Sequence, residues 1–332
     1  MFETGGRGMH KELINEATIK LIIEPDGPIL IKAGENGADP TRPIMEFVRT
    51  YQNDKEIIYL PGSSLKGVVR SHAERIARTV DKSDKKNWLS CNPLGSVSDR
   101  NCEKGEDYSC NKYFENKGVK ERLGKDESKR GSAVYKESCF ICKMFGNTAL
   151  ASHINITDAY PIGDVKIERR NGVAIDRVFG SVAVGPFQYE VATDGKFETN
   201  IHIKNFTIAQ LGLLALVLRD IHEQRVPLGF AKSRGLGRIK ANIDYAKINY
   251  PTGEFLCVED NKLYGVGKLY QVPKDYCFPE DDYIVQDLKY DPDGWCGKNV
   301  KLEGMEPDQP LYNLWLQCVG KWSGFVKEEN GK

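Results

Sequence analysis

The order of helix and strand patterns along the chain constrains its fold more than any other feature of the sequence. Alternating β-branched residues, as in ATIKLII, indicate strands, and apolar residues that return every three or four positions, as in LKGVVRSHAERIARTV, indicate helices. Strand, helix, strand, strand and helix are predicted, in that order, at residues 17–23, 65–80, 151–160, 199–206 and 207–224. Residues 229–248 are predicted to be a glycine-rich turn that enters the last strand. This is the βαββαβ plan, so the sequence predicts an α+β protein with a ferredoxin-like core over residues 15–250.

Two long segments lie outside this plan. Residues 81–145 are polar and cysteine-rich and show no clear period, so we expect an insertion rather than a part of the core. The pattern also weakens after Tyr250, and residues 251–332 are expected to form a C-terminal extension that packs on the body or on a neighbour. Within this extension, residues 311–320 fit either a short helix or a strand.

The zero net charge of the 332-residue chain conceals a gradient. Residues 251–332 hold 15 Asp or Glu against 9 Lys and no Arg, a net charge of −6, so residues 1–250 carry +6. A basic body with an acidic extension suits a polyanionic partner. The chain has no run of 18 apolar residues and no signal-peptide pattern, so we expect a cytoplasmic protein without a membrane partner.

Residues 61–67, PGSSLKG, start the first predicted helix abruptly. Ser63 or Ser64 is expected to be its N-cap, because a hydroxyl can accept hydrogen bonds from the first free amides. Free amides and the helix dipole also attract an anion to such a start. An ordinary capped helix is the simpler alternative. If a phosphate binds at this helix start, the expected contacts are Ser63, Ser64, Lys66, Arg70 and His72.

A second basic stretch, GFAKSRGLGR, covers residues 229–238. Its glycines let the backbone come close to a phosphate, and the charge would be neutralised by Lys232, Arg234 and Arg238. A surface turn with solvated cations is the alternative. The Walker spacing is missing, because no Gly-Lys-Ser/Thr ends the loop, and this argues against a nucleoside triphosphate. Two such stretches in one chain favour a nucleic acid.

The cysteines of the insertion have the spacing of a metal site. Cys139 and Cys142 form a CxxC pair, at which two thiolates can share a tetrahedral zinc ion. Cys91 with either Cys102 or Cys110 would complete the site. Unligated thiols are the alternative, but a long polar insertion without a core benefits from a metal staple, so we favour structural zinc. Core or surface thiols are expected at the single positions Cys257, Cys277, Cys296 and Cys318.

Asp39 lies in GENGADPTRP, on the loop between the first strand and the first helix. An aspartate there could bind a metal ion or orient a ribose 2′-hydroxyl beside an RNA phosphate. An Asx-type turn before proline is the alternative, and the local sequence favours it.

Four stretches resemble, in this order, the RAMP proteins of CRISPR–Cas systems: PGSSLKGVVRSHAERI, SCFICKMFGNTALAS, RNGVAIDRVFGSVAVGPF and LGFAKSRGLGRI. The likeness is greatest to the backbone subunits of type III effector complexes, especially their zinc-binding type III-D branch. It covers residues 15–248, and its most specific part is PGSSLKG combined with a C-terminal GLGR. The resemblance implies a ferredoxin-like RNA-recognition fold whose partners are CRISPR RNA, target RNA and other Cas subunits.

The resemblance also implies roles for individual segments. The helix start and the glycine-rich loop would grip guide phosphates, and residues 162–192 would form a β-hairpin "thumb" that pushes between bases. On this hairpin, the RNA backbone would be held by Arg169, Arg170 and Arg177, and the bases would be wedged apart by Val173, Ile175 or Phe179. The zinc ligands predicted on this basis are Cys91, Cys110, Cys139 and Cys142, with Cys102 as the alternative to Cys110.

In slicing members of this family, a loop aspartate after the first strand cleaves target RNA with a divalent cation such as Mg²⁺ or Mn²⁺. By position that aspartate is Asp39, and the reaction would be attack by the neighbouring ribose 2′-hydroxyl. Relatives of this branch often carry an aspartate where this chain has Ile44, so the alternative is a subunit that holds RNA without cutting it. A guide-processing nuclease would need a histidine in the early loop, and residues 24–43 contain none.

Overall fold

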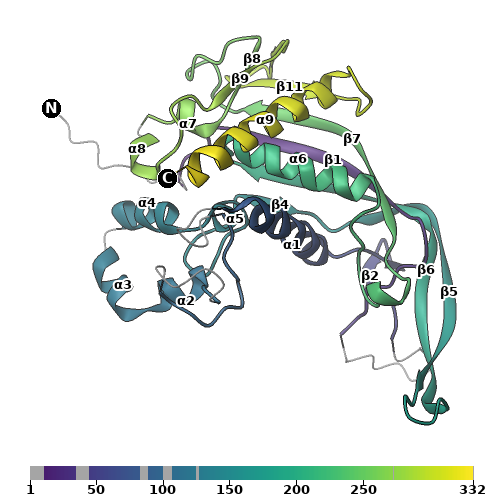
Figure 1. The fold of residues 1–332 in the computed structure, drawn as a ribbon. Helices are drawn as coiled ribbons and strands as arrows, with labels where there is room; N and C mark the ends of the chain where they lie inside the picture. The colour runs from purple at the N-terminus through teal and green to yellow at the C-terminus, as the bar shows by residue number, and fades with distance from the viewer. Residues whose placement is uncertain are drawn as a thin grey trace.

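The computed structural model describes residues 11–34, 45–82, 89–99, 107–124, 127–271 and 273–331. It is a mixed α+β structure (Figure 1). The strands are β1 (Glu16–Pro25), β2 (Arg49–Gln52), β3 (Lys55–Ile58), β4 (Ile154–Ile156), β5 (Tyr160–Ile175), β6 (Val182–Lys204), β7 (Ile239–Tyr250), β8 (Lys262–Tyr264), β9 (Tyr283–Val285), β10 (Asp291–Pro292) and β11 (Lys298–Leu302). The helices are α1 (Gly62–Val80), α2 (Cys110–Glu115), α3 (Lys117–Leu123), α4 (Glu127–Glu137), α5 (Phe140–Phe145), α6 (Ile208–His222), α7 (Val266–Leu269), α8 (Pro273–Tyr276) and α9 (Pro310–Asn330), with a 3-10 turn at Lys232–Arg234.

The main sheet carries its strands in the order β10-β11-β7-β1-β6-β4, with β5 paired to β6 outside this path. The central strand β1 lies between β6 and β7, and the pairings within this sheet are antiparallel. Buried and half-buried residues alternate along β1, so Ile19, Leu21 and Ile23 enter the core. The strand predicted at residues 17–23 is therefore confirmed.

Helices α1 and α6 lie side by side, and α9 packs along α6 (Figure 1). Between α1 and α6, the side chains of His72 and Asp220 meet with Nε2 and Oδ2 2.7 Å apart. Between α6 and α9 the backbones come so close that a Cβ at Gly212 would lie 2.1 Å from the carbonyl oxygen of Cys318. The extension after β7 is thus part of the same packed body.

Helix α1 begins two or three residues earlier than a cap at Ser63 or Ser64 would place it. Its first residue is Gly62 and its N-cap is Pro61, which has no capping side chain. The carboxylate of Asp158 accepts a hydrogen bond from the Gly62 amide at 2.7 Å instead. The prediction of Ser63 or Ser64 as the N-cap is therefore wrong, because the acceptor comes from a residue distant in the sequence. Both serines lie in the first helical turn.

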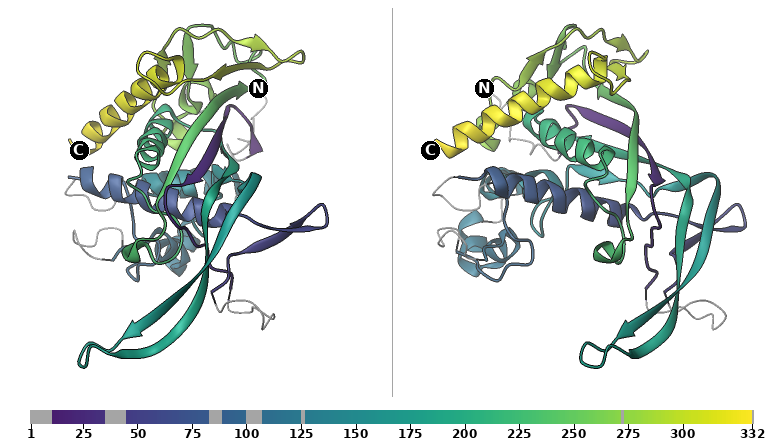
Figure 2. Two further views of the ribbon diagram at one scale, coloured as in Figure 1. Left: turned by 90° about the vertical axis from the view of Figure 1, so that its right-hand side faces the viewer. Right: turned by 45° about the vertical axis from the view of Figure 1, so that its right-hand side comes forward.

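Strands β5 and β6 continue beyond the sheet as a long two-stranded hairpin that projects from the body (Figure 2). The turn at its tip is closed by Asp176, whose Oδ1 accepts from the amides of Val178 and Phe179 at 2.7 and 2.9 Å. These backbone hydrogen bonds lower the pKa of the Asp176 carboxyl. The apolar side chains near the tip have no core to enter.

The two segments outside the predicted plan also have defined structure. Helices α2 to α5 occupy the described part of the insertion, and α5 lies against α1. In the C-terminal segment, β11 pairs with β7 and so widens the sheet, and residues 311–320 belong to the helix α9. Among the helices of the described residues, none combines the length and apolar character that crossing a membrane would require.

Candidate metal centre and nucleic-acid interface

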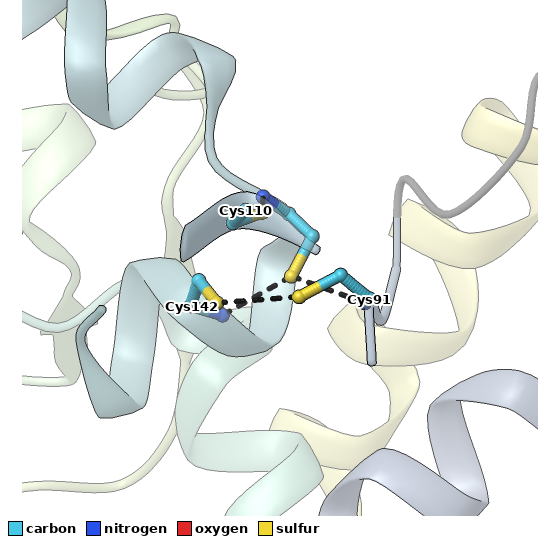
Figure 3. A group of neighbouring side chains, drawn as sticks. Cys91, Cys110 and Cys142 are labelled. Atoms are coloured by element: carbon cyan, nitrogen blue, oxygen red, sulfur yellow. Dashed lines mark hydrogen bonds between the residues drawn. The ribbon is translucent and has the colours of Figure 1, made fainter. Parts of the chain in front are cut away.

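Four cysteines that are far apart in the sequence converge beside α1. Cys110 opens α2, Cys139 is the N-cap of α5, Cys142 lies in the first turn of α5, and Cys91 comes from the loop that precedes α2. All four are buried, and their sulfur atoms lie within 4.8 Å of one another (Figure 3 shows three of them). Cys102, the alternative to Cys110, lies outside the described residues.

The sulfur positions fit a tetrahedral metal ion. Sulfurs about 2.3 Å from zinc lie about 3.8 Å from one another, and the Sγ atoms of Cys91 and Cys142 are 3.7 Å apart. Backbone amides also point at the sulfurs: those of Cys91 and Cys142 donate to Cys139 at 3.4 Å, and that of Cys139 donates to Cys110 at 3.5 Å. Such N–H···S contacts stabilise thiolates, so this donor set suits zinc.

The protonation of Cys139 agrees with this role. Burial alone would raise the pKa of its thiol, but hydrogen bonds from the thiols of Cys110, Cys142 and Cys91 and from the Cys142 amide lower it well below its ordinary value. A thiolate, not a thiol, is the form that binds a metal ion. The centre thus presents one sulfur already poised to lose its proton.

Three of the predicted phosphate contacts on α1 have partners inside the protein. Lys66 Nζ donates to Ser152 Oγ at 2.8 Å and to a backbone carbonyl at 3.0 Å. Burial, and then the neighbouring charge of Arg70, lower the pKa of Lys66. Arg70 donates to Cys142 Sγ at 3.7 Å, and His72 is buried against Asp220. Ser63 is exposed and Ser64 is half-buried, and both amides have no acceptor within the described part of the chain.

A groove of about 490 Å³ runs between α1 and the glycine-rich loop. Helix α1 contributes small side chains at Ser64, Gly67 and Ser71, and then Arg75. Opposite them lies the chain from Val226 to Phe230 together with Lys232. The lining is completed by Ile31, Lys32, Val68 and His72. The groove therefore brings together the two phosphate-binding stretches that the sequence predicted separately.

The glycine-rich loop owes its shape to its glycines. Gly229 and Gly237 have φ angles of 90° and 94°, and a Cβ at either would lie within 2.4 Å of a carbonyl oxygen. The basic side chains of the loop are exposed. The guanidinium carbon of Arg234 lies 5.5 Å from the centre of the Phe230 ring, and Lys232 lines the groove. Arg238 instead pairs with Asp26 at 2.8 Å, away from the groove lining.

The predicted thumb residues lie on the projecting hairpin. Arg177, Val173, Ile175 and Phe179 are exposed near its tip, and Phe179 is 83% exposed. Arg169 and Arg170 lie nearer the body, where their closest acidic partners are Glu190 at 3.8 Å and Glu168 at 3.2 Å. The hairpin tip thus lies at the end of β5 and β6 that projects away from the main sheet (Figure 2).

Asp39 and Ile44 lie outside the described residues. The chain on either side of them is placed. Lys32, before them, lines the groove and forms a bridge with Phe47. Met45, after them, forms a bridge with Tyr189 in the hairpin. Of the described residues that flank Asp39, Lys32 therefore lies at the groove and Met45 at the hairpin.

Sequence reasoning missed several groove residues. Lys32 lies in a turn-rich loop with no recognisable motif, and only the fold brings it to α1. Gly67, Ser71 and Arg75 follow the serines at helical spacing, so the polar face of the predicted helix could have indicated them. Within the described residues, Lys32, Arg75 and Lys232 have no acidic partner, which leaves their charges available.

Comparison with known proteins gives one family. The model of the RAMP superfamily matches residues 22–240, from β1 to the start of β7. A search of curated proteins gave no match. The matched segment includes α1, the hairpin, the four clustered cysteines and the glycine-rich loop, and the chain therefore belongs to the RAMP superfamily.

Proposed function

We propose that this protein is a CRISPR RNA-binding backbone subunit of a type III effector complex in the cytoplasm, with other Cas subunits and target RNA as further partners. The groove between α1 and the glycine-rich loop carries this proposal, because it joins helix-start amides to unpaired cations. The family membership and the basic body support it. We also propose a ferredoxin-like core, which the order β7-β1-β6-β4 and its antiparallel pairings support.

The groove suits a ribose-phosphate strand. The amides of Ser63 and Ser64 can donate to phosphate oxygens at the positive end of the helix dipole. Small side chains at Gly67 and Ser71 leave room for a backbone to lie along α1, and Arg75 and Lys232 supply charge on both sides. Contacts of this kind bind any guide sequence, since they address the backbone and leave the bases free to pair with a target.

Lys66 and Arg70 take an indirect part in this proposal, because their contacts with Ser152 and Cys142 fix α1 against its neighbours and neither lines the groove. His72 does line the groove, but its Nε2 is held by Asp220, so the phosphate contacts are proposed for the other residues that face the groove. The four cysteines hold a structural zinc ion, as in the type III-D branch. Zinc would tie the short helices α2 and α5 to the body, since helices of six residues are not stable alone.

The hairpin of β5 and β6 serves as the thumb. Its exposed tip side chains, Val178 and Phe179, can insert between bases, and Arg177 can hold the adjacent backbone. A stack of bases would cover apolar surface that the chain itself leaves in water.

Asp39 is proposed to assist cleavage of target RNA. This is supported by the placement of its neighbours in the chain, because Lys32 lines the groove and Met45 pairs with the hairpin. The test is the Asp39→Ala variant in the reconstituted complex with labelled target RNA. Loss of one cleavage product with guide binding intact supports slicing. An unchanged set of products supports the alternative, a subunit that only holds RNA.

The RNA-binding proposal itself is tested by the salt dependence of affinity for CRISPR RNA. For single strands, each neutralised phosphate contributes about 0.7 to the slope of log K against log salt. The double variant Lys232→Gln, Arg234→Gln should therefore lower the slope by about 1.4. Arg122→Gln is the matched control, because Arg122 pairs with Glu137 in the insertion. Equal slopes for all three proteins would refute the groove as the binding site.

A further inference from the structure

Helix α1 contacts the cysteine cluster through a half-buried arginine, Arg70. The Arg70 guanidinium donates to Cys142 Sγ at 3.7 Å and to the carbonyl of Gly146 at 3.1 Å, and its Nε donates to Glu74 Oε1 at 2.9 Å. Arg70 thus donates to α1 itself and to the last turn of α5, which runs from Cys142 to Gly146. A cationic donor at this position also offsets the −2 charge of a zinc ion with four thiolates.

The contacts continue to a second cysteine. Glu74, which is buried, accepts from Arg78 through its other oxygen at 3.0 Å. Arg78 in turn donates to the carbonyl of Cys91 at 2.9 Å. Since the sulfurs of Cys91 and Cys142 lie 3.7 Å apart, the contacts form a closed circuit from one cysteine through α1 to the other.

The same turns of α1 also form the wall of the groove. Each of the first two residues of the circuit immediately precedes a groove residue, Arg70 before Ser71 and Glu74 before Arg75. Consecutive helical residues point about 100° apart. The circuit and the groove therefore occupy neighbouring stripes of one helix, and a rotation or shift of α1 would change both.

We propose that Arg70 is a positioning residue that couples metal binding to RNA binding. With the metal in place, Arg70, Glu74 and Arg78 hold α1 in the register that aligns Ser64, Ser71 and Arg75 along the groove. Loss of the metal frees Cys142 and Cys91 to move apart, and the helix loses its anchor. Coupling between two sites is reciprocal, so RNA should raise metal affinity by the factor by which metal raises RNA affinity.

The experiment compares the full-length protein with Arg70→Gln, and with Arg122→Gln as the control, since Arg122 lies in the insertion that carries the cysteines and pairs with Glu137. Zinc release to a chromogenic chelator and affinity for CRISPR RNA are measured, the latter with zinc bound and after its removal. The natural protein and the control should lose about tenfold in RNA affinity without zinc, within the usual range of coupling. Arg70→Gln should release zinc several-fold faster than the natural protein, and the ratio of its RNA affinities with and without zinc should be near one. Arg70→Lys should give values between those of Arg70→Gln and of the natural protein. The inference would be overturned if Arg70→Gln and the natural protein released zinc at the same rate and had the same ratio of RNA affinities with and without zinc.

The RNA part of this experiment depends on the proposed function, and a second measurement does not. Hydrogen exchange of the α1 amides is followed with zinc bound and removed. Exchange over residues 70–78 should quicken on zinc removal in the natural protein, and it should already be fast in Arg70→Gln with zinc bound. If no protein binds RNA but this pattern holds, the proposed function fails and the anchor stands. If the exchange rates of these amides change neither on zinc removal nor in Arg70→Gln, the anchoring role of Arg70 is refuted. Should Arg70→Gln not fold, the same test is made with Arg78→Gln.

Discussion

At the scale of single residues, Asp282 links the C-terminal segment to the core. Its two carboxylate oxygens accept from the amides of Ile208, at the start of α6, and of Gly267, both at 2.9 Å. Burial raises the pKa of Asp282 to about 7, although both hydrogen bonds favour the charged form. The folded protein therefore holds this proton more tightly than the unfolded chain does.

The sign of the resulting pH dependence follows from the raised pKa of Asp282. Its contribution to the free energy of unfolding is fully present below about pH 4 and is lost as the pH rises toward 7, at up to about 1.4 kcal/mol per pH unit. The Asp282→Asn variant should lack this pH-dependent contribution to the free energy of unfolding. It should also be less stable by about 1–3 kcal/mol, because the Asn amide cannot accept from both backbone amides. Urea unfolding at pH 5, 6 and 7 measures both effects, and parallel profiles for the two proteins would contradict the assignment.

The cysteines provide a second prediction at this scale. Cys139→Ser should lose bound zinc and unfold at a lower temperature, because Cys139 accepts two backbone amides and lies at the centre of the cluster. Cys296→Ser is the matched control, since Cys296 lies in the C-terminal segment. Metal analysis after dialysis, with thermal unfolding, measures both effects. One zinc ion retained by Cys139→Ser would show that the cluster is not the metal site.

At the scale of elements, the sequence predicted those segments whose pattern is periodic. The alternation in β1 and the apolar run of α6 appear directly in the burial of their side chains. The predicted start of α1 was wrong by two or three residues, because its capping acceptor, Asp158, follows β4 and is not indicated by the local sequence. The helices α2 to α5 were not predicted, since helices of six to eleven residues in a polar segment depend on tertiary contacts rather than on period.

The hairpin gives a prediction about an element that contributes little to the core. Val178→Ser combined with Phe179→Ser should change the free energy of unfolding by less than about 0.5 kcal/mol, because both side chains are 83% exposed. The same variant should unstack fewer guide bases, which a fluorescent adenine analogue in the RNA reports. Val285→Ser, in the exposed part of β9, is the control. Unaltered fluorescence in the hairpin variant would remove these side chains from the proposed wedge.

At the scale of the whole molecule, α1 is shared by the two candidate sites. One of its stripes meets the cysteine cluster and the next lines the groove, and α6 supports it from the side through His72. The sequence indicated the PGSSLKG and GFAKSRGLGR stretches but not that they face each other across a groove. Nor did it indicate Lys32, which reaches the groove because the chain after β1 bonds to the loop through Leu30 and Phe230. The groove is formed by contacts between segments that are distant in the sequence, and no local sequence pattern indicates such contacts.

The C-terminal segment shows the same limit. Its acidic composition and weak periodicity left residues 311–320 open between a helix and a strand and predicted no other element, yet β11 widens the sheet and α9 covers α6. Its role becomes visible only when Gly212 and Cys318 are seen in contact.

Gly67, at the middle of the groove lining on α1, is the position at which RNA binding in the groove can be tested most directly. A Cβ at Gly67 meets no atom within 4 Å, so Gly67→Ala and Gly67→Glu should both fold, the former with about 1 kcal/mol more stability. Affinity for labelled CRISPR RNA is then measured by fluorescence anisotropy for the protein alone and in its complex. If RNA lies in the groove, Gly67→Ala should bind RNA as the natural protein does. Gly67→Glu should bind RNA at least about tenfold more weakly, a loss of about 1.4 kcal/mol in binding free energy. Equal affinity for the two variants would contradict RNA binding in the groove.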